Sequence, residues 1–333
     1  MERIRVGVIG LGWFGEHHID TYQSIPYADV AAVCTRRKEH LDSIAAKYNV
    51  QKKYTDYKDL LADKDIDMVS VVTHVMDHMQ PAVDAIKAGK HVFLEKPMAN
   101  TVEECDMILD ALKGTDKFFM VGHICRFDTA YALAKEEIEA GSIGKIISMH
   151  AKRNLAKWVT ASSLDKISAL FGDGIHDFDL MMWYTGAKPK TVYAQTTNTR
   201  PEFKFDDIAW ALFRLDDGSF AIIENIWSLP DNVPYAIDAK IEIVGTEGVI
   251  DIDNSGRNYS VLTKKGLSFP QSTYWPKVHN MRRGYLREEM EYFLKCILQN
   301  RRPSIITPQQ SRDVVYAMRM AEKSAAENRV ITF

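Results

Sequence analysis

Short apolar runs alternate with amphipathic segments over roughly the first 120 residues. The runs predict strands, and the segments between them carry apolar residues at helical spacing, with Leu41, Ile44 and Ala45 as one example. Strands are expected at 4–10, 29–35, 67–73, 91–96 and 118–123, and helices at 16–25, 38–50, 79–89 and 101–114. Continuous apolar strands between helices are typical of a parallel sheet that is covered on both faces. We therefore expect an N-terminal α/β domain with a doubly wound Rossmann sheet.

The pattern changes near residue 123. A helix is expected at 128–141, followed by strands at 145–154, 190–198, 207–215, 218–228, 239–253 and 257–266, and by closing helices at 284–299 and 308–327. Alternating apolar and polar positions predict a large, mostly antiparallel sheet with one open face. The sequence thus predicts two domains, 1–122 and 123–333, and leaves open whether the closing helices pack back on the first domain.

Composition narrows the class of protein. The 333 residues carry a net charge of −3, and no basic block suggests nucleic acid or a membrane surface as a partner. No apolar run approaches the ~20 residues of a membrane span, and the N-terminus lacks a signal-peptide pattern. The cysteines form no CxxC pair; they are Cys34, Cys105, Cys125 and Cys296. We expect free thiols in a cytoplasmic protein and no metal site.

A glycine motif follows the first predicted strand. Gly10, Gly12 and Gly15 have G-x-G-x-x-G spacing, with Trp13 and Phe14 between the last two. The motif follows a strand and opens a helix, the context in which it binds a dinucleotide. Gly10 would form the tight turn, Gly12 would let a pyrophosphate approach, and Gly15 would let the helix pack closely on the strand. A plain strand-to-helix turn is the alternative.

The end of the second predicted strand bears on which dinucleotide is bound. NAD-selective sites usually have an acid there, which bonds the ribose 2′-hydroxyl. This chain has Thr35, Arg36 and Arg37 instead. Guanidinium groups suit a 2′-phosphate, so the sequence favours NADP and leaves NAD as the second choice. The alternative is a solvated basic loop without a nucleotide role.

A lysine ends the fourth predicted strand of the first domain, in the segment Glu95-Lys96-Pro97. Ligands of doubly wound sheets bind beyond the carboxyl ends of the strands, so Lys96 is expected to project into that crevice. An ammonium there can bond a reacting hydroxyl or stabilise a developing alkoxide. The alternative is a surface lysine that pairs with Glu95.

Together, the glycine motif, the Glu-Lys-Pro segment and the stretch Gly172–Gly186 resemble the Gfo/Idh/MocA oxidoreductases. This family includes glucose–fructose oxidoreductases and inositol dehydrogenases. The resemblance extends to residues 122–146 and 302–331, and so covers essentially the whole chain. It implies a Rossmann domain followed by a domain that binds substrate and forms oligomers.

The resemblance also implies catalytic residues. Lys96 matches the family's lysine, and His176 matches a histidine that acts as acid and base on the substrate hydroxyl, for which imidazole has a suitable intrinsic pKa. Asp179 matches a following acid, which orients the imidazole or simply favours the helix N-terminus. The family's aspartate four residues before the histidine is replaced by Gly172. Either Asp173 takes its role, or the site works without that carboxylate.

Further contacts are implied by position in the family pattern. Expected cofactor contacts, besides Lys96, are Thr73, His78, Glu95 and His123; expected substrate contacts, besides Lys96, Asp173 and His176, are Arg126, Asn154 and Trp158. For several of these, an exposed or solvated residue without a ligand is an equally good interpretation.

The implied function is NAD(P)-dependent hydride transfer at a secondary alcohol of a sugar, sugar derivative or cyclic polyol. Two alternatives are open: a dinucleotide-binding sensor without turnover, and an eliminase or glycosidase that uses its redox cofactor transiently. The apolar strands 207–215 and 220–228 would leave an exposed face on a monomer. A homodimer or homotetramer through the C-terminal sheet is therefore expected.

Overall fold

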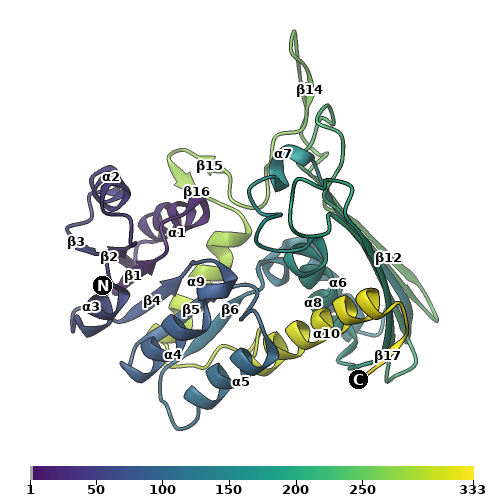
Figure 1. The fold of residues 1–333 in the computed structure, drawn as a ribbon, viewed down its shortest axis with the longest axis horizontal. Helices are drawn as coiled ribbons and strands as arrows, with labels where there is room; N and C mark the ends of the chain where they lie inside the picture. The colour runs from purple at the N-terminus through teal and green to yellow at the C-terminus, as the bar shows by residue number, and fades with distance from the viewer. Residues whose placement is uncertain (1–2) are drawn as a thin grey trace. The chain divides into compact units, whose positions relative to one another are not determined.

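The computed structural model describes residues 3–333 and divides into two compact units. The first unit runs to Phe127 and also contains Tyr274–Val315. The second comprises Asp128–Thr273 and Tyr316–Phe333. Each unit has its own sheet (Figure 1).

The first unit is built on a six-stranded parallel sheet with the order β3-β2-β1-β4-β5-β6. Its strands are β1 (Ile4–Ile9), β2 (Ala28–Cys34), β3 (Lys52–Tyr54), β4 (Met68–Val71), β5 (His91–Glu95) and β6 (Phe119–Gly122). Strand β4 in the middle of the sheet and strand β6 at its edge are buried at every position, as expected for a sheet with helices on both faces. The predicted Rossmann sheet is confirmed.

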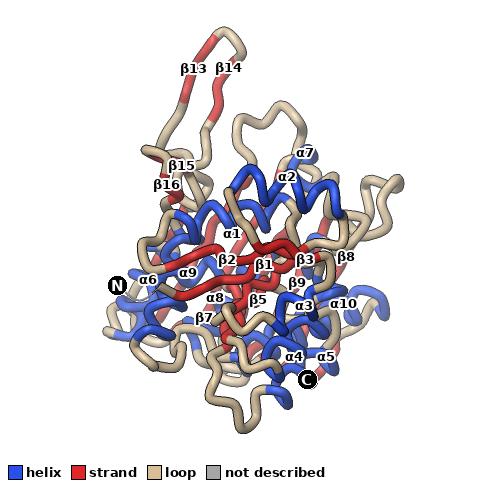
Figure 2. Tube along the Cα trace, turned by 90° about the vertical axis from the view of Figure 1, so that its left-hand side faces the viewer, coloured by secondary structure: helices blue, strands red, loops and turns tan. Residues whose placement is uncertain are grey.

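Helices cover both faces of this sheet. They are α1 (Trp13–Gln23), α2 (Lys38–Tyr48), α3 (Tyr57–Ala62), α4 (Met79–Lys87) and α5 (Val102–Ala111). Figure 2 shows α1 and α2 over one face and α3, α4 and α5 over the other. Thr101 and Glu104 form a capping box, which explains why α5 begins where it does.

The later part of the first unit returns to the same sheet. It contains the short strands β15 (Lys277–Val278) and β16 (Met281–Arg282), helix α9 (Tyr285–Leu298) and the first part of α10 (Pro308–Glu327). Phe293 of α9 lies 5.9 Å, between ring centroids, from Phe93 of β5, and both are fully buried. Helix α9 therefore belongs to the core of the Rossmann unit.

The predicted boundary after residue 122 differs from this division. Residues 123–127, which include the short helix η2 (Ile124–Phe127), and residues 274–315 lie with the first unit. One cause is Arg126, which donates to the carbonyl of Ile305 at 2.7 Å and to Gln310 at 3.1 Å. Strand β3 and helix α3 were not predicted, because they are short and polar.

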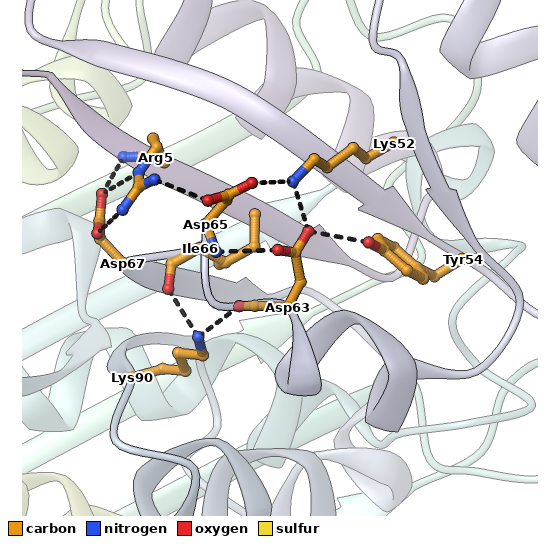
Figure 3. A network of polar contacts seen from close by, with 8 residues as sticks. All are labelled: Arg5, Lys52, Tyr54, Asp63, Asp65, Ile66, Asp67 and Lys90. Carbon is orange, nitrogen blue, oxygen red and sulfur yellow. Dashed lines mark hydrogen bonds and ion pairs between the residues drawn. The ribbon is translucent and has the colours of Figure 1, made fainter.

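A charged network joins the amino-terminal ends of the strands (Figure 3). Lys52 lies 2.8 Å from both Asp63 and Asp65, and Tyr54 donates to Asp63 at 2.9 Å. Two further cations, Arg5 and Lys90, hold the same loop: Arg5 donates to Asp67, and Lys90 donates to the carbonyls of Asp63 and Ile66. The loop before β4 is thus fixed to β1 and β3 at the edge opposite the carboxyl ends of the strands.

The second unit is built on a seven-stranded sheet with the order β12-β11-β7-β10-β9-β8-β17. Its strands are β7 (Ile146–Leu155), β8 (Pro189–Thr197), β9 (Ile208–Leu215), β10 (Phe220–Ile226), β11 (Ile237–Gly245), β12 (Val249–Asp253) and β17 (Ile331–Thr332). All neighbouring pairs are antiparallel except β7 and β10, which are parallel. The predicted mostly antiparallel sheet is confirmed.

Helices of the second unit pack on one face of its sheet, and the other face exposes large apolar side chains. The helices are α6 (Thr129–Glu139), α7 (Lys157–Thr160), the π-helical turn η3 (Leu170–Gly174), α8 (Ile175–Thr185) and the last part of α10; a hairpin of β13 (Val261–Thr263) and β14 (Gly266–Ser268) is also present. Buried and exposed positions alternate along β9. The exposed residues include Tyr193, Trp210, Leu212 and Phe220.

The charged network gives a prediction for stability. Pairing with Lys52 lowers the pKa of Asp63 from its usual 3.8 to about 2. A carboxyl whose pKa is lower in the folded chain stabilises it above the unfolded pKa, and this stability is lost as the pH falls through the folded pKa. We expect Asp63→Asn to lower the free energy of unfolding by about 1–2 kcal/mol at pH 7.

Urea unfolding of both proteins measures this difference, which should be full above about pH 4 and should shrink as the pH approaches 2. Asp65→Asn is the matched control, because Asp65 is exposed and should contribute less than about 0.5 kcal/mol. A difference that did not change below pH 4 would show that the Asp63 charge is not what stabilises the loop.

Candidate active site

The glycine motif has the geometry of a dinucleotide-binding turn. Gly10 has a φ of +96°, and a Cβ on Gly15 would lie 2.0 Å from the carbonyl oxygen of Gly10. Both positions therefore require glycine. Gly12 is the N-cap of α1, where no side chain caps the helix and no heavy atom lies within 4 Å of the Cβ position. Open space at bare helix N–H groups fits a pyrophosphate.

Aromatic side chains surround the start of α1. Trp13 is 66% exposed, and Trp275 lies 5.7 Å from it and 5.3 Å from Phe14, between ring centroids. Trp275 comes from the returning segment, which Lys277 and Arg282 attach to Asp20 of α1. Sequence reasoning missed Trp275, because nothing in its local pattern indicates a neighbour some 260 residues away.

The ends of β2 and β4 meet through Asp77. Thr35, Arg36 and Arg37 follow β2 directly, and Arg36 is exposed and pairs with Asp77 at 3.2 Å. Thr73, which follows β4, donates to the carbonyl of Asp77 at 2.9 Å. The predicted cofactor residues from these two strands therefore lie at one edge of the sheet.

His78 is buried at this edge of the sheet and contacts the backbone of two loops. It is 1% exposed, and its ring nitrogens lie 2.8 Å from the carbonyl oxygen of Pro97 and 3.0 Å from that of Thr73. Burial lowers the pKa of His78. With both nitrogens against the backbone, His78 joins the loops after β4 and β5. Its predicted contact with the cofactor stays a prediction.

A buried chain of hydrogen bonds fixes the end of β5. His18 lies 2.9 Å from Glu95 through Nε2 and 2.8 Å from Ser70 through Nδ1, and it is fully buried. Tyr22 donates to Ser70 at 3.4 Å, and burial raises the pKa of Tyr22, which keeps the phenol protonated. With the ring proton on Nε2, His18 donates to the Glu95 carboxylate.

Lys96 leaves the sheet directly from this fixed point. The other carboxylate oxygen of Glu95 accepts the backbone N–H of Lys96 at 3.2 Å. The Glu95 carboxylate therefore bonds inward to His18 and to the main chain of Lys96. This arrangement supports the prediction that Lys96 projects beyond the carboxyl end of β5.

Two further predicted contacts lie in the first unit. His123 follows β6 at the carboxyl edge and is 1% exposed. The guanidinium of Arg126 is buried and bonded to Ile305 and Gln310, as described above. Arg126 thus joins η2 to the loop before α10 and to α10 itself, and its predicted substrate contact stays a prediction.

In the second unit, His176 lies in the first turn of α8, directly after the π-helical turn η3. Its Nε2 is 3.9 Å from Oδ1 of Asp173. Arg153 of β7 donates to Asp177 at 2.8 Å, and both are buried, which anchors the start of α8 to the sheet. Burial raises the pKa of Asp177 in spite of Arg153. Asp179, the third acid of this segment, is fully buried.

The remaining predicted substrate contacts separate into two kinds. Asn154 donates to Glu224 at 2.7 Å and accepts the N–H of Ile226 at 2.9 Å, so its amide bonds within the sheet, and its predicted substrate contact stays a prediction. Trp158 of α7 is 59% exposed and available for contact. The structure adds Trp227, which donates to Asp173 at 2.8 Å and which sequence reasoning missed.

Residues 3–333 contain no group of three or more His, Cys, Asp or Glu side chains placed to hold a metal ion. No helix in this part of the chain is long and apolar enough to cross a membrane.

The fold and the glycine turn define a two-domain, dinucleotide-binding oxidoreductase. Residues 4–123 match the model of the oxidoreductase family with an NAD-binding Rossmann fold, and residues 131–251 match the GFO/IDH/MocA C-terminal domain. The chain belongs to the GFO/IDH/MocA family of oxidoreductases. The resemblance inferred from the sequence is thereby confirmed.

Several relatives and structures resemble the chain along most of its length. Myo-inositol 2-dehydrogenase of Thermotoga maritima is 29% identical over 98% of this chain and 98% of its own. Scyllo-inositol 2-dehydrogenase (NAD(+)) of Bacillus subtilis is 29% identical over 91% of this chain and 89% of its own. The structure of scyllo-inositol dehydrogenase from Lactobacillus casei with bound NAD(H) and scyllo-inositol has a TM-score of 0.83, 24% identity and 99% coverage of both chains.

The buried chain below Lys96 gives a second prediction. His18→Ala would leave the Glu95 carboxylate buried without its imidazole partner, and breaking such a pair typically costs about 3 kcal/mol or more. His18→Gln, which keeps an amide donor, is the matched variant and should lose less. Urea unfolding at neutral pH measures both. A loss below about 1 kcal/mol for His18→Ala would contradict the claim that this contact fixes the end of β5.

Proposed function

We propose that this chain is an NAD(P)-dependent dehydrogenase that oxidises a secondary alcohol of a cyclic polyol or sugar, reversibly. The observation that carries the proposal is Lys96, which leaves the fixed carboxyl end of β5 in a Rossmann unit of this family. Relatives that match 98% and 91% of the chain are named as inositol dehydrogenases, which supports a cyclic polyol as substrate.

The proposed mechanism assigns the hydroxyl proton to two side chains. His176 accepts the proton of the reacting hydroxyl, and Lys96 bonds the same oxygen and stabilises its developing negative charge. Asp173, 3.9 Å from His176, holds the substrate beside the imidazole. Asp179, one helical turn after His176, keeps the imidazole oriented. Trp158 contacts the substrate from α7.

The bound dinucleotide supplies the hydride acceptor, and the chain supplies its position. The N-terminus of α1, with Gly12 exposed, holds the pyrophosphate, and Trp13 and Phe14 flank it. Glu95, Thr73 and His123 belong to the same carboxyl edge of the sheet. Two of the dehydrogenases cited above, those of Bacillus subtilis and Lactobacillus casei, are named with NAD, so NADP rests on the basic residues after β2 alone.

The exposed face of the second sheet supports a homodimer or homotetramer, because a large apolar face is unusual on a monomer. Light scattering that gave the mass of a single chain would exclude this assembly. The cysteines Cys34, Cys105, Cys125 and Cys296 are all buried thiols, which supports the proposed cytoplasmic location.

Arg36 offers a test of the cofactor assignment. If its guanidinium binds a 2′-phosphate, Arg36→Ala should lower kcat/KM for NADP about tenfold and leave that for NAD unchanged. Steady-state kinetics with both cofactors measure this. Equal effects on the two cofactors, or no effect on NADP, would remove NADP from the proposal.

The catalytic assignment predicts the activity of two variants. With NAD or NADP and a panel of inositols and aldoses, the wild type should produce reduced nicotinamide, which absorbance detects. Lys96→Ala and His176→Ala should each lower kcat roughly 100-fold or more, because each removes a group that acts on the reacting oxygen. Lys113→Ala is the control, since Lys113 is exposed and pairs with Asp110 on the surface.

The same assay decides between the proposal and its alternatives. A bound cofactor with no turnover of any polyol or sugar would indicate a sensor. Tightly retained cofactor with product formed but no net reduced nicotinamide would indicate elimination or glycoside cleavage. Near-normal turnover of His176→Ala would contradict its assigned role.

A further inference from the structure

Trp227 is a buried tryptophan of the second unit that several contacts hold in place. It follows β10, is 4% exposed, and donates its backbone N–H to the carbonyl of Asp207 at 2.7 Å. Its own carbonyl accepts the hydroxyl of Thr160 at 2.9 Å. Its ring belongs to a core cluster with Leu155, Leu164 and Ala169. Both the main chain and the ring of Trp227 are therefore fixed.

The ring occupies the space that a side chain at position 172 would need. A Cβ on Gly172 would lie 2.5 Å from Cη2 and 2.7 Å from Cζ2 of Trp227, closer than real Cβ contacts come. Gly172 lies within the π-helical turn η3, and π-turns are frequent at functional sites. The indole of Trp227 can therefore occupy this position because residue 172 is a glycine.

The indole also bonds the next residue. Trp227 Nε1 donates to Oδ2 of Asp173 at 2.8 Å, and Oδ1 of the same carboxylate lies 3.9 Å from Nε2 of His176. That distance exceeds a hydrogen bond, but one hydroxyl, or two neighbouring hydroxyls of a substrate, can bond both atoms. One oxygen of Asp173 is committed to the indole, and the other is directed toward the imidazole.

We propose that Trp227 is a positioning residue for the reaction, acting through Asp173. The indole ring excludes a side chain at 172, and its N–H holds the Asp173 carboxylate beside His176, where the pair binds the substrate's hydroxyl groups. The proposal rests on the proposed function in assigning His176 to the reacting hydroxyl. It adds that Asp173 acts at full strength only while Trp227 holds it.

A double-mutant cycle tests this coupling. Trp227→Phe keeps a ring and removes the N–H, and Asp173→Ala removes the carboxylate. We expect Trp227→Phe to lower kcat for the best polyol about tenfold and Asp173→Ala to lower it roughly 100-fold. The double variant should be no slower than Asp173→Ala, because the indole then has nothing to position. Trp183→Phe, on α8, is the control and should keep wild-type kcat.

Fold-changes that multiplied in the double variant would overturn the proposal, since a purely structural loss does not depend on the carboxylate. Gly172→Ala is a second route that keeps Trp227: its methyl group displaces the ring, and its effect on kcat should also vanish in the Asp173→Ala background. A persistent effect there would likewise count against the proposal.

The same cycle measured by urea unfolding needs no substrate. Trp227→Phe should shift the unfolding midpoint more in the wild-type background than in the Asp173→Ala background, because only the former contains the bond. If no polyol or sugar is turned over, the proposed function fails while this unfolding coupling still tests the contact. Equal midpoint shifts in both backgrounds would refute the contact itself.

Discussion

The arrangement of the first unit depends on one buried contact, between the His18 imidazole and the Glu95 carboxylate. A carboxylate in a sheet interior is costly unless donors satisfy it, and here the donors are His18 and the N–H of Lys96. The space it occupies is left by Gly122, whose Cβ would lie 3.0 Å from Oε1 of Glu95. Lys96, to which we assign the proposed chemistry, therefore follows a residue that contacts from α1, β5 and β6 hold in place.

In the Rossmann sheet, the amino edge carries stabilising ion pairs, and the carboxyl edge carries the predicted binding residues. At the amino edge, Lys52, Arg5 and Lys90 neutralise and fix the acidic loop before β4 (Figure 3). At the carboxyl edge, Arg36 is exposed, and the N-terminus of α1 has no side-chain cap. A sheet held at one edge leaves the other edge for ligands, which is where doubly wound folds bind them. In the second unit, Arg153 donates to Asp177 and Trp227 donates to Asp173, the two acids on either side of His176.

Hydrophobic periodicity was sufficient to predict most of the fold, because long apolar strands and amphipathic helices carry a strong local signal. The glycine turn was also predictable, because its motif follows a strand and opens a helix; the catalytic role of Lys96 stays a prediction. The contacts of His78, Arg126 and Asn154 were not predictable, because each bonds a backbone group or side chain that is distant in sequence or lies in a different element. Trp227 was invisible for the same reason, although Gly172 next to Asp173 was a sign that the site departs from its family. The return of 274–315 to the first unit likewise depends on long-range packing, such as Phe93 on Phe293.

The central proposal is that the Lys96 ammonium and the His176 imidazole act on the same alcohol. The most direct measurement is a crystal structure of the chain with dinucleotide and a cyclic polyol bound. It should show Lys96 Nζ and His176 Nε2 each about 3 Å from a single carbinol oxygen. A complex in which the two groups bond different oxygens, or face separate cavities, would contradict the claim.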